Sequence, residues 1–267
     1  MKKLLCIVGF LVLAAELPLW CYDTSPYWYQ VVPEAVWASA TGGGTWVTEI
    51  QITSFASTAA DIKVWFDTSG GSRGSFLLHT GLAQHHSVRF SNILAVIDAL
   101  DPDAFDYYGR AGALYFETVD SSSRIQVQAK TVNGNYGKTF PGINIAEGNT
   151  AAEGRPLIIQ DLVTNATYRT SVGIYNTSDS PYTVRLTIID ANNVVVGTYF
   201  DKSLGSYAFM SFNPFTQAGV TSGTYENCWL LINVTSGGSA AQGVMCYGSI
   251  ANNTTNDTYA LIARMYN

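Results

Sequence analysis

The three histidines, His79, His85 and His86, are the first candidates for chemistry, because imidazole serves as a metal ligand and as a general base. Either role also needs carboxylate, thiol or hydroxyl groups close by in the fold. His85 and His86 are adjacent, so in a strand they would point to opposite faces and could not share one ion. We interpret the histidines as exposed turn or strand residues, with a metal site as the alternative.

The densest acidic cluster is Asp101-Pro102-Asp103-Ala104-Phe105-Asp106. Calcium takes several oxygen ligands from one loop, and Asp101, Asp103 and Asp106 alternate in a way that could supply them. The cluster lacks the glycine at the sixth position and the glutamate at the twelfth that an EF-hand loop requires. We predict a solvated loop here, with a calcium site on these three residues as the alternative.

Enzymes that use paired carboxylates or a nucleophile leave recognisable patterns, and this chain shows none of the common ones. It contains no Gly-x-Ser-x-Gly, His-Glu-x-x-His or phosphate-binding loop. A glycosidase needs two facing carboxylates, which the spacing of the candidates does not pair. We therefore predict a protein that is not an enzyme and has no cofactor, and keep a hydrolase as the third hypothesis. The candidate glutamates are Glu34, Glu49, Glu117, Glu147, Glu153 and Glu226.

The N-terminus has the pattern of a secretory leader. Met1-Lys2-Lys3 is followed by an apolar run from Leu4 to Ala15, a basic region and then a hydrophobic region. The run is short for a transmembrane anchor, which is the alternative. We predict a signal peptide over residues 1–20, a secreted or cell-surface protein, and no membrane span after the leader is removed.

Two cysteines, Cys228 and Cys246, lie in strand-like runs of the second half of the chain. In an exported protein, two cysteines of one domain usually form a disulfide. We predict a Cys228–Cys246 bond between neighbouring strands, and the alternative is a pair of buried thiols.

The composition favours a β protein and argues against a nucleic-acid partner. Hydrophobic residues make up 47% of the chain and charged residues 13%, with a formal net charge of −6 and a pI of about 4.9. This charged share is about half of the usual one, and uncharged polar residues suit exposed strand faces and turns. Lys and Arg are scattered singly, so no basic stripe is available for nucleic acid.

An internal repeat organises the chain. Thr45–Ile52 and Thr167–Ile174 share the pattern Thr, aromatic, any, Thr, any, β-branched, any, Ile, at an offset of 122 residues. Short alternating strands, frequent turns and no long helix predict an all-β fold of two tandem antiparallel β-sandwich domains related by internal duplication. One short helix is expected over Asn92–Leu100. We expect the Thr pair to tie the strand start to a neighbouring turn.

The repeat also predicts the domain boundaries, with repeat 1 over residues 31–152 and repeat 2 over residues 153–267. The offset between aligned residues of the two repeats changes at Asp101–Arg110 of repeat 1 and at Thr235–Ser239 of repeat 2. Such changes are expected where one repeat has extra residues in a loop. Gly148–Gly154 is a short junction, so we expect the two domains to hold a fixed relation.

The repeated motif resembles tandem β-sandwich repeats of uncharacterised secreted bacterial surface proteins. Those often carry Trp-Arg-Thr-Asp before the strand and a final Asp-Asn-x-Thr-Gly-Asp turn. The counterparts here are Trp46-Val47-Thr48-Glu49, Tyr168-Arg169-Thr170-Ser171 and Ala251–Asp257. The resemblance covers most of the chain after the leader and implies surface display rather than a known reaction.

An aromatic segment over residues 21–30 precedes the first repeat and has no counterpart in the second. Its Tyr27, Trp28 and Tyr29 could form a linker or first strand laid over repeat 1, or could add to the sheet edge of a neighbouring copy. The function we predict is a structural or adhesive protein that assembles with copies of itself, as a fibre or surface layer, through sheet edges and this segment. The alternative is a carbohydrate-binding protein with surface glycans as partners.

Overall fold

The computed structural model describes residues 25–40, 43–101, 103, 105–145, 151–152, 154–237 and 243–266. The predicted signal peptide, residues 21–24 of the aromatic segment and most of the predicted junction lie outside the described residues. Neither of the two helices in the described ranges is long and apolar enough to cross a membrane.

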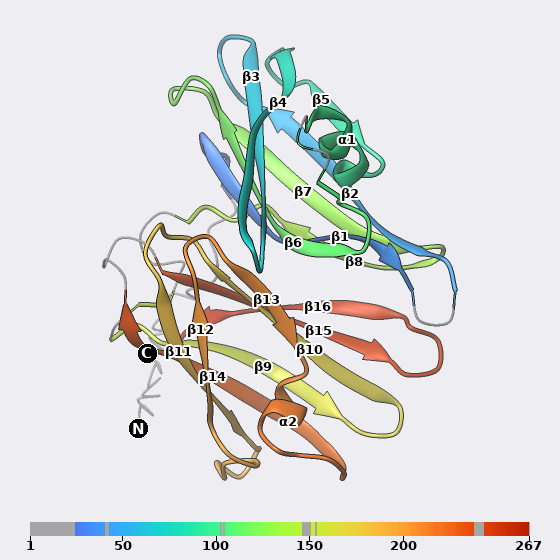
Figure 1. Cartoon of the computed structure of the whole chain (residues 1–267), viewed down its shortest axis with the longest axis vertical. Helices are drawn as coiled ribbons and strands as arrows, with labels where there is room; N and C mark the ends of the chain where they lie inside the picture. Colours follow the sequence, from blue (N-terminus) through green and yellow to red (C-terminus); the bar gives the residue numbers. More distant parts are fainter. Residues whose placement is uncertain are drawn as a thin grey trace, which may run out of the picture.

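The first half of the chain forms one continuous antiparallel sheet that folds over on itself (Figure 1). The strand order is β4-β3-β6-β1-β2-β7-β8. Strand β5 is not part of this order and pairs with β2. Strand β1 pairs with β6 up to Trp37 and with β2 from Trp37 onward, so it links the two parts of the sheet. The elements are β1 (Tyr29–Ser39), β2 (Thr45–Ser54), β3 (Ala60–Thr68), β4 (Gly71–Leu82), β5 (Ser87–Phe90), α1 (Ile93–Leu100), β6 (Arg110–Thr118), β7 (Ile125–Asn133) and β8 (Tyr136–Pro141).

The second half forms two antiparallel sheets. The inner sheet has the order β13-β10-β15-β16, and the outer sheet has the order β12-β11-β14-β9-β17. The elements are β9 (Leu157–Thr164), β10 (Tyr168–Asn176), β11 (Tyr182–Ile189), β12 (Phe200–Leu204), β13 (Phe209–Phe212), α2 (Pro214–Gln217), β14 (Tyr225–Gly237), β15 (Val244–Asn252), β16 (Thr258–Ile262) and β17 (Arg264–Met265).

The strand pairings of the second half repeat those of the first. β10 pairs with β13 and β15 as β2 pairs with β5 and β7, and β11 pairs with β12 and β14 as β3 pairs with β4 and β6. β14 likewise pairs with β9 as β6 pairs with β1. The predicted class, all-β with tandem antiparallel sandwiches, is confirmed. The domain boundaries themselves stay predictions.

The predicted helix is α1, which begins after Asn92, whose side chain accepts a hydrogen bond from the Ala95 N–H. A second, four-residue helix, α2, was not expected. Asn213 caps it in the same way, and Pro214 starts it. An Asn cap followed by Pro is a helix-start signal. The helix occupies the same place after β13 that α1 occupies after β5, so the repeat could have predicted it.

The second threonine of the repeated motif has the same role in both halves. The hydroxyl oxygen of Thr48 accepts a hydrogen bond from the Val36 N–H at 2.8 Å. The hydroxyl of Thr170 accepts from the Val163 N–H at 3.0 Å and donates to the Val163 carbonyl at 2.7 Å. Val163 lies in the outer sheet and Thr170 in the inner sheet, so this hydroxyl joins two sheets. The prediction that this threonine bonds to a neighbouring turn was therefore wrong, because its partner lies in the preceding strand.

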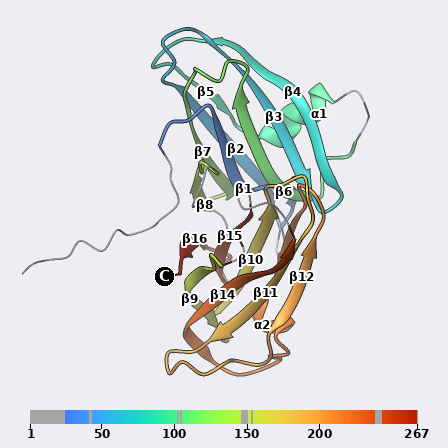
Figure 2. The same ribbon diagram turned by 90° about the vertical axis from the view of Figure 1, so that its left-hand side faces the viewer.

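The inner sheet is the middle layer of the molecule, between the outer sheet and the first half (Figures 1 and 2). Its strand β15 is buried on both faces from Val244 to Ala251. The equivalent strand of the first half, β7, alternates buried and exposed residues from Ile125 to Thr131. One copy of the strand thus borders water on one face, whereas the other copy is covered by the partner half.

Candidate functional site

The most unusual polar chemistry of the described residues lies where the first half packs on the inner sheet, a contact that we call the seam. Burying charged groups is costly unless they are paired. The side chains of the seam that carry charge or a buried hydroxyl include Glu34, Asp67 and Lys138 from the first half and Tyr175, Tyr247, Ser249 and Thr258 from the second.

A buried ion pair stands at the centre of the seam. The Lys138 Nζ atom lies 2.7 Å from Glu34 Oε1 and donates to Glu34 Oε2 at 2.8 Å, and only 10% and 9% of the two side chains are exposed. The same ammonium donates to the Ser249 hydroxyl at 3.1 Å across the seam. It also lies 5.6 Å and 5.8 Å from the ring centroids of Phe140 and Tyr247. Lys138 therefore links the two halves electrostatically.

A second buried contact crosses the seam between β3 and β10. The phenol of Tyr175 donates to Asp67 Oδ2, and both residues are 2% exposed. Burial raises the pKa of Asp67 to about 6, although hydrogen bonding lowers it in part. Burial, and then the Asp67 carboxylate, raise the pKa of Tyr175 well above its usual value. Tyr115 and Tyr207 lie near enough to interact with the Asp67 charge. At neutral pH this carboxylate is an unfavourable buried charge.

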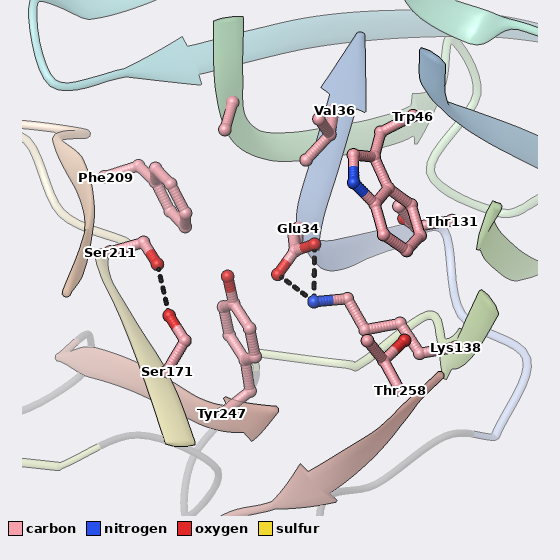
Figure 3. Close-up of a pocket in the computed structure, with 11 residues that line it drawn as sticks. Glu34, Val36, Trp46, Thr131, Lys138, Ser171, Phe209, Ser211, Tyr247 and Thr258 are labelled. Atoms are coloured by element: carbon pink, nitrogen blue, oxygen red, sulfur yellow. Dashed lines mark hydrogen bonds and ion pairs between the residues drawn. The ribbon is translucent and has the colours of Figure 1, made fainter. Parts of the chain in front are cut away.

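A pocket of about 210 Å³ opens beside the Glu34–Lys138 pair (Figure 3). The Tyr247 hydroxyl points into it, as Figure 3 shows, and makes no hydrogen bond, although Glu34 and Ser211 are close enough to influence its pKa. Burial and the Glu34 charge raise that pKa well above the usual value, so the phenol stays protonated. The lining residues are Glu34, Val36, Trp46, Ala111, Thr131, Lys138, Ser171, Phe209, Ser211, Tyr247 and Thr258.

Gly173 places the Tyr247 ring. The two residues are cross-strand partners on β10 and β15, and the ring lies over the glycine. A Cβ atom at position 173 would stand 1.9 Å from Tyr247 Cε1 and 2.2 Å from Cζ, far inside van der Waals contact. At the matching position β2 has Gln51, which is exposed. The glycine is therefore a requirement of the seam and not of the strand.

We expect Gly173→Ala to lower the free energy of unfolding by about 1–3 kcal/mol, because the ring must leave its position. Gly205→Ala is the matched control, since a Cβ there meets nothing within 4 Å. Urea denaturation of both variants measures the difference. Equal stability of Gly173→Ala and the wild type would show that the ring is not held against this glycine.

The acidic cluster serves local backbone turns. Asp101 Oδ1 accepts from the Asp103 N–H at 2.9 Å, and Asp101 Oδ2 accepts from the Tyr107 hydroxyl at 2.6 Å. Asp106 Oδ1 accepts from the Tyr108 N–H at 3.0 Å. Within the described ranges, no three His, Cys, Asp or Glu side chains lie close enough together to hold a metal ion. Asp101, Asp103 and Asp106, which the sequence offered as calcium ligands only in the alternative to a solvated loop, do not form such a group.

The predicted Cys228–Cys246 disulfide is absent, and both residues are buried thiols, as the alternative prediction had it. The physical reason is that the expected neighbouring strands, β14 and β15, belong to different sheets. Each cysteine packs in the core instead, where burial raises the pKa of Cys228 to about 11 and that of Cys246 further.

The aromatic segment pairs within its own chain. Tyr27 forms a β-bridge with Ile125, and the Trp28 carbonyl accepts from the Thr118 N–H. Tyr29 begins β1, and its ring stacks on Tyr115 at 5.7 Å. The structure thus places Tyr27–Tyr29 as the start of a first strand that pairs within the first half, which was one of the two predicted interpretations.

The remaining candidates lie apart from the seam. His85 and His86 occupy the turn between β4 and β5, and His79 lies on the edge strand β4. Glu49 pairs with exposed Arg89. Glu117 lies on β6, and Glu226 accepts a hydrogen bond from the Asn165 side chain. Glu147 and Glu153 lie outside the described residues.

Glu34 was among the candidates predicted from the sequence, but its partner Lys138 was not, nor were Asp67, Tyr175 and Tyr247. One signal could have found part of the seam. β15 reads Val244-Met-Cys-Tyr-Gly-Ser-Ile250 without polar alternation, which indicates a strand covered on both faces.

The motif that carries the family resemblance forms a small network in the second half. Arg169 donates to the side-chain oxygens of Asn253 and Asn256, both at 3.0 Å, and so ties the repeated strand to the final turn. When the whole chain is compared with known proteins, no protein-family model matches it and no curated protein is significantly similar to it.

Proposed function

We propose that this chain is a secreted structural or adhesive protein that acts without catalysis and assembles with copies of itself through its sheet edges. The observation that carries the proposal is the seam, where the polar side chains with unusual environments join the two halves. Buried polar contacts cross this interface, from Lys138 to Ser249 and from Tyr175 to Asp67, and each of them favours one relative orientation of the two halves. A rigid pair of sandwiches suits a building block of a fibre or surface layer.

Two equivalent edge strands supply surfaces for assembly. β4 pairs only with β3, and β12 pairs only with β11, among the described strands. Leu77 on β4 is 49% exposed, and Tyr199, which stands at the same repeat position directly before β12, is 56% exposed. Unpaired strand edges with exposed apolar side chains are templates for pairing with another chain. Copies could therefore associate through β4 of one molecule and β12 of the next.

The aromatic N-terminal segment has a smaller part in this proposal than in the sequence-based prediction. Its backbone hydrogen bonds join β6 and β7 of the same chain, so an exchange between copies would first have to break them. Secretion rests on the leader pattern alone.

We expect the chain without its leader to show a mass that rises with concentration, measured by size exclusion with light scattering, and to form ordered assemblies under the electron microscope. Leu77→Lys should shift the population toward monomer, because lysine on an edge strand opposes strand pairing. Val119→Lys is the control, since Val119 is 55% exposed but lies beyond the end of β6. A wild type that stays monomeric at every concentration would refute the proposal, as would a control variant with the same effect.

A further inference from the structure

We propose that the seam pocket is a binding site for a neutral, hydroxyl-rich ring, namely a single sugar residue. The site does not depend on self-association, so it goes beyond the function proposed above. It names a binding site and a ligand class for the alternative function, which is carbohydrate binding.

Two hydroxyl groups in the pocket wall lack partners. The Tyr247 hydroxyl, on a side chain that is 2% exposed, and Thr258 Oγ1 make no hydrogen bond of good geometry in the fold, although Glu34 and Ser211 lie close to the phenol. A buried hydroxyl without a partner costs about 1–3 kcal/mol, so native proteins rarely leave one unsatisfied. Because Tyr247 points into the pocket, as Figure 3 shows, a ligand in the pocket can supply the missing acceptor or donor.

The charges of the pocket favour a neutral ligand. Glu34 and Lys138 are paired at 2.7 Å, so the local charge is balanced. An anion would meet the Glu34 carboxylate, and a cation would meet the Lys138 ammonium, without a second partner to compensate. A ligand hydroxyl can instead donate to Glu34 and accept from Lys138. The Ser171 and Ser211 hydroxyls, 3.0 Å apart, add further donors and acceptors on the opposite wall.

The apolar part of the pocket suits a ring. The Trp46 indole and the Phe209 ring stand on opposite sides of it in Figure 3. Aromatic faces with a few fixed polar groups are the usual composition of a ligand site. The C–H faces of a sugar ring can pack against such side chains while its hydroxyls reach the polar wall. The volume of about 210 Å³ is below that of sites for drug-sized ligands, and a single small ring fits this limit.

The test is an NMR titration of the tryptophan indole N–H signals. The Trp46 signal is identified as the one that disappears in the Trp46→Phe variant. The probes are glucose, galactose, mannose and N-acetylglucosamine, with open-chain sorbitol and the charged sugars glucuronate and glucosamine for comparison. We expect at least one neutral sugar to shift the Trp46 signal in a saturable way, and to bind more tightly than sorbitol and the charged sugars. The titration is repeated on Leu77→Lys, so that a failure of self-assembly does not affect it.

Tyr247→Phe should weaken that binding at least about fivefold, because it removes one buried hydrogen bond to the ligand. Its melting temperature should equal or exceed that of the wild type, since phenylalanine removes a buried hydroxyl that the fold does not satisfy. Tyr259→Phe is the control: Tyr259 is 51% exposed and does not line the pocket. The proposal fails if no neutral sugar gives a saturable shift, if sorbitol or a charged sugar binds as well, or if Tyr247→Phe binds like the wild type.

Discussion

Lys138→Met is expected to lower the free energy of unfolding by about 3–5 kcal/mol, the largest effect we expect from a single substitution. The change removes the ammonium and leaves the Glu34 carboxylate buried, 7% exposed, without its partner. It also removes the bond to Ser249 across the seam. Urea denaturation at neutral pH measures the loss.

The double variant Glu34→Met with Lys138→Met should recover most of this loss, because replacing a buried pair by apolar side chains of similar size is often nearly neutral. The chain contains a matched control in the Glu49–Arg89 pair, whose side chains are 23% and 67% exposed. Arg89→Met should cost less than about 1 kcal/mol, since water screens an exposed pair. If Lys138→Met costs no more than Arg89→Met, the seam pair does not hold the two halves together.

Asp67→Asn is expected to stabilise the protein at neutral pH by up to about 3 kcal/mol, the free energy that corresponds to a pKa raised from 3.8 to about 6. The raised pKa means that the folded chain binds a proton more tightly than the unfolded chain. Stability therefore falls as the pH rises from about 4 to about 6, and this contribution stays lost above pH 6. Asparagine carries no charge and can still accept the Tyr175 hydrogen bond.

The measurement is the free energy of unfolding of wild type and variant between pH 4 and pH 8. The two curves should converge toward pH 4 and separate toward pH 7. Asp61→Asn is the control, because Asp61 lies on the same strand, β3, but is exposed. Parallel curves for Asp67→Asn and the wild type would show that Asp67 has the same pKa in the folded and unfolded chains.

Much of the fold could be predicted from local pattern. The alternation in Ile62, Val64 and Phe66 predicts a strand with one buried face, and all three side chains are buried in the core. The same pattern recurs in Val184, Leu186 and Ile188, which β11 buries in the same way. Side chains of a strand alternate between faces, so burial of one face leaves a period of two in the sequence. The repeat then carries the topology of one half over to the other.

The seam could not be predicted in this way. On its outward face β7 has Gln126, Gln128 and Lys130, all exposed, whereas the aligned positions of β15 are Met245, Tyr247 and Ser249, all buried. These replacements, together with Gly173 in place of Gln51, mark a second buried face. They do not tell which surface covers it.

The sequence by itself determined the strands, their antiparallel class and the duplication. The strands follow from residues close together in the chain, and the duplication follows from the likeness of two stretches of the same sequence. The tertiary structure alone decided which carboxylates are buried, which backbone groups the repeated threonine bonds, and that the two cysteines lie in different sheets. Lys138 lies 104 residues from Glu34, and Tyr175 lies 108 residues from Asp67. Contacts at such separations depend on how two finished sheets pack, and no local period in the sequence records that packing.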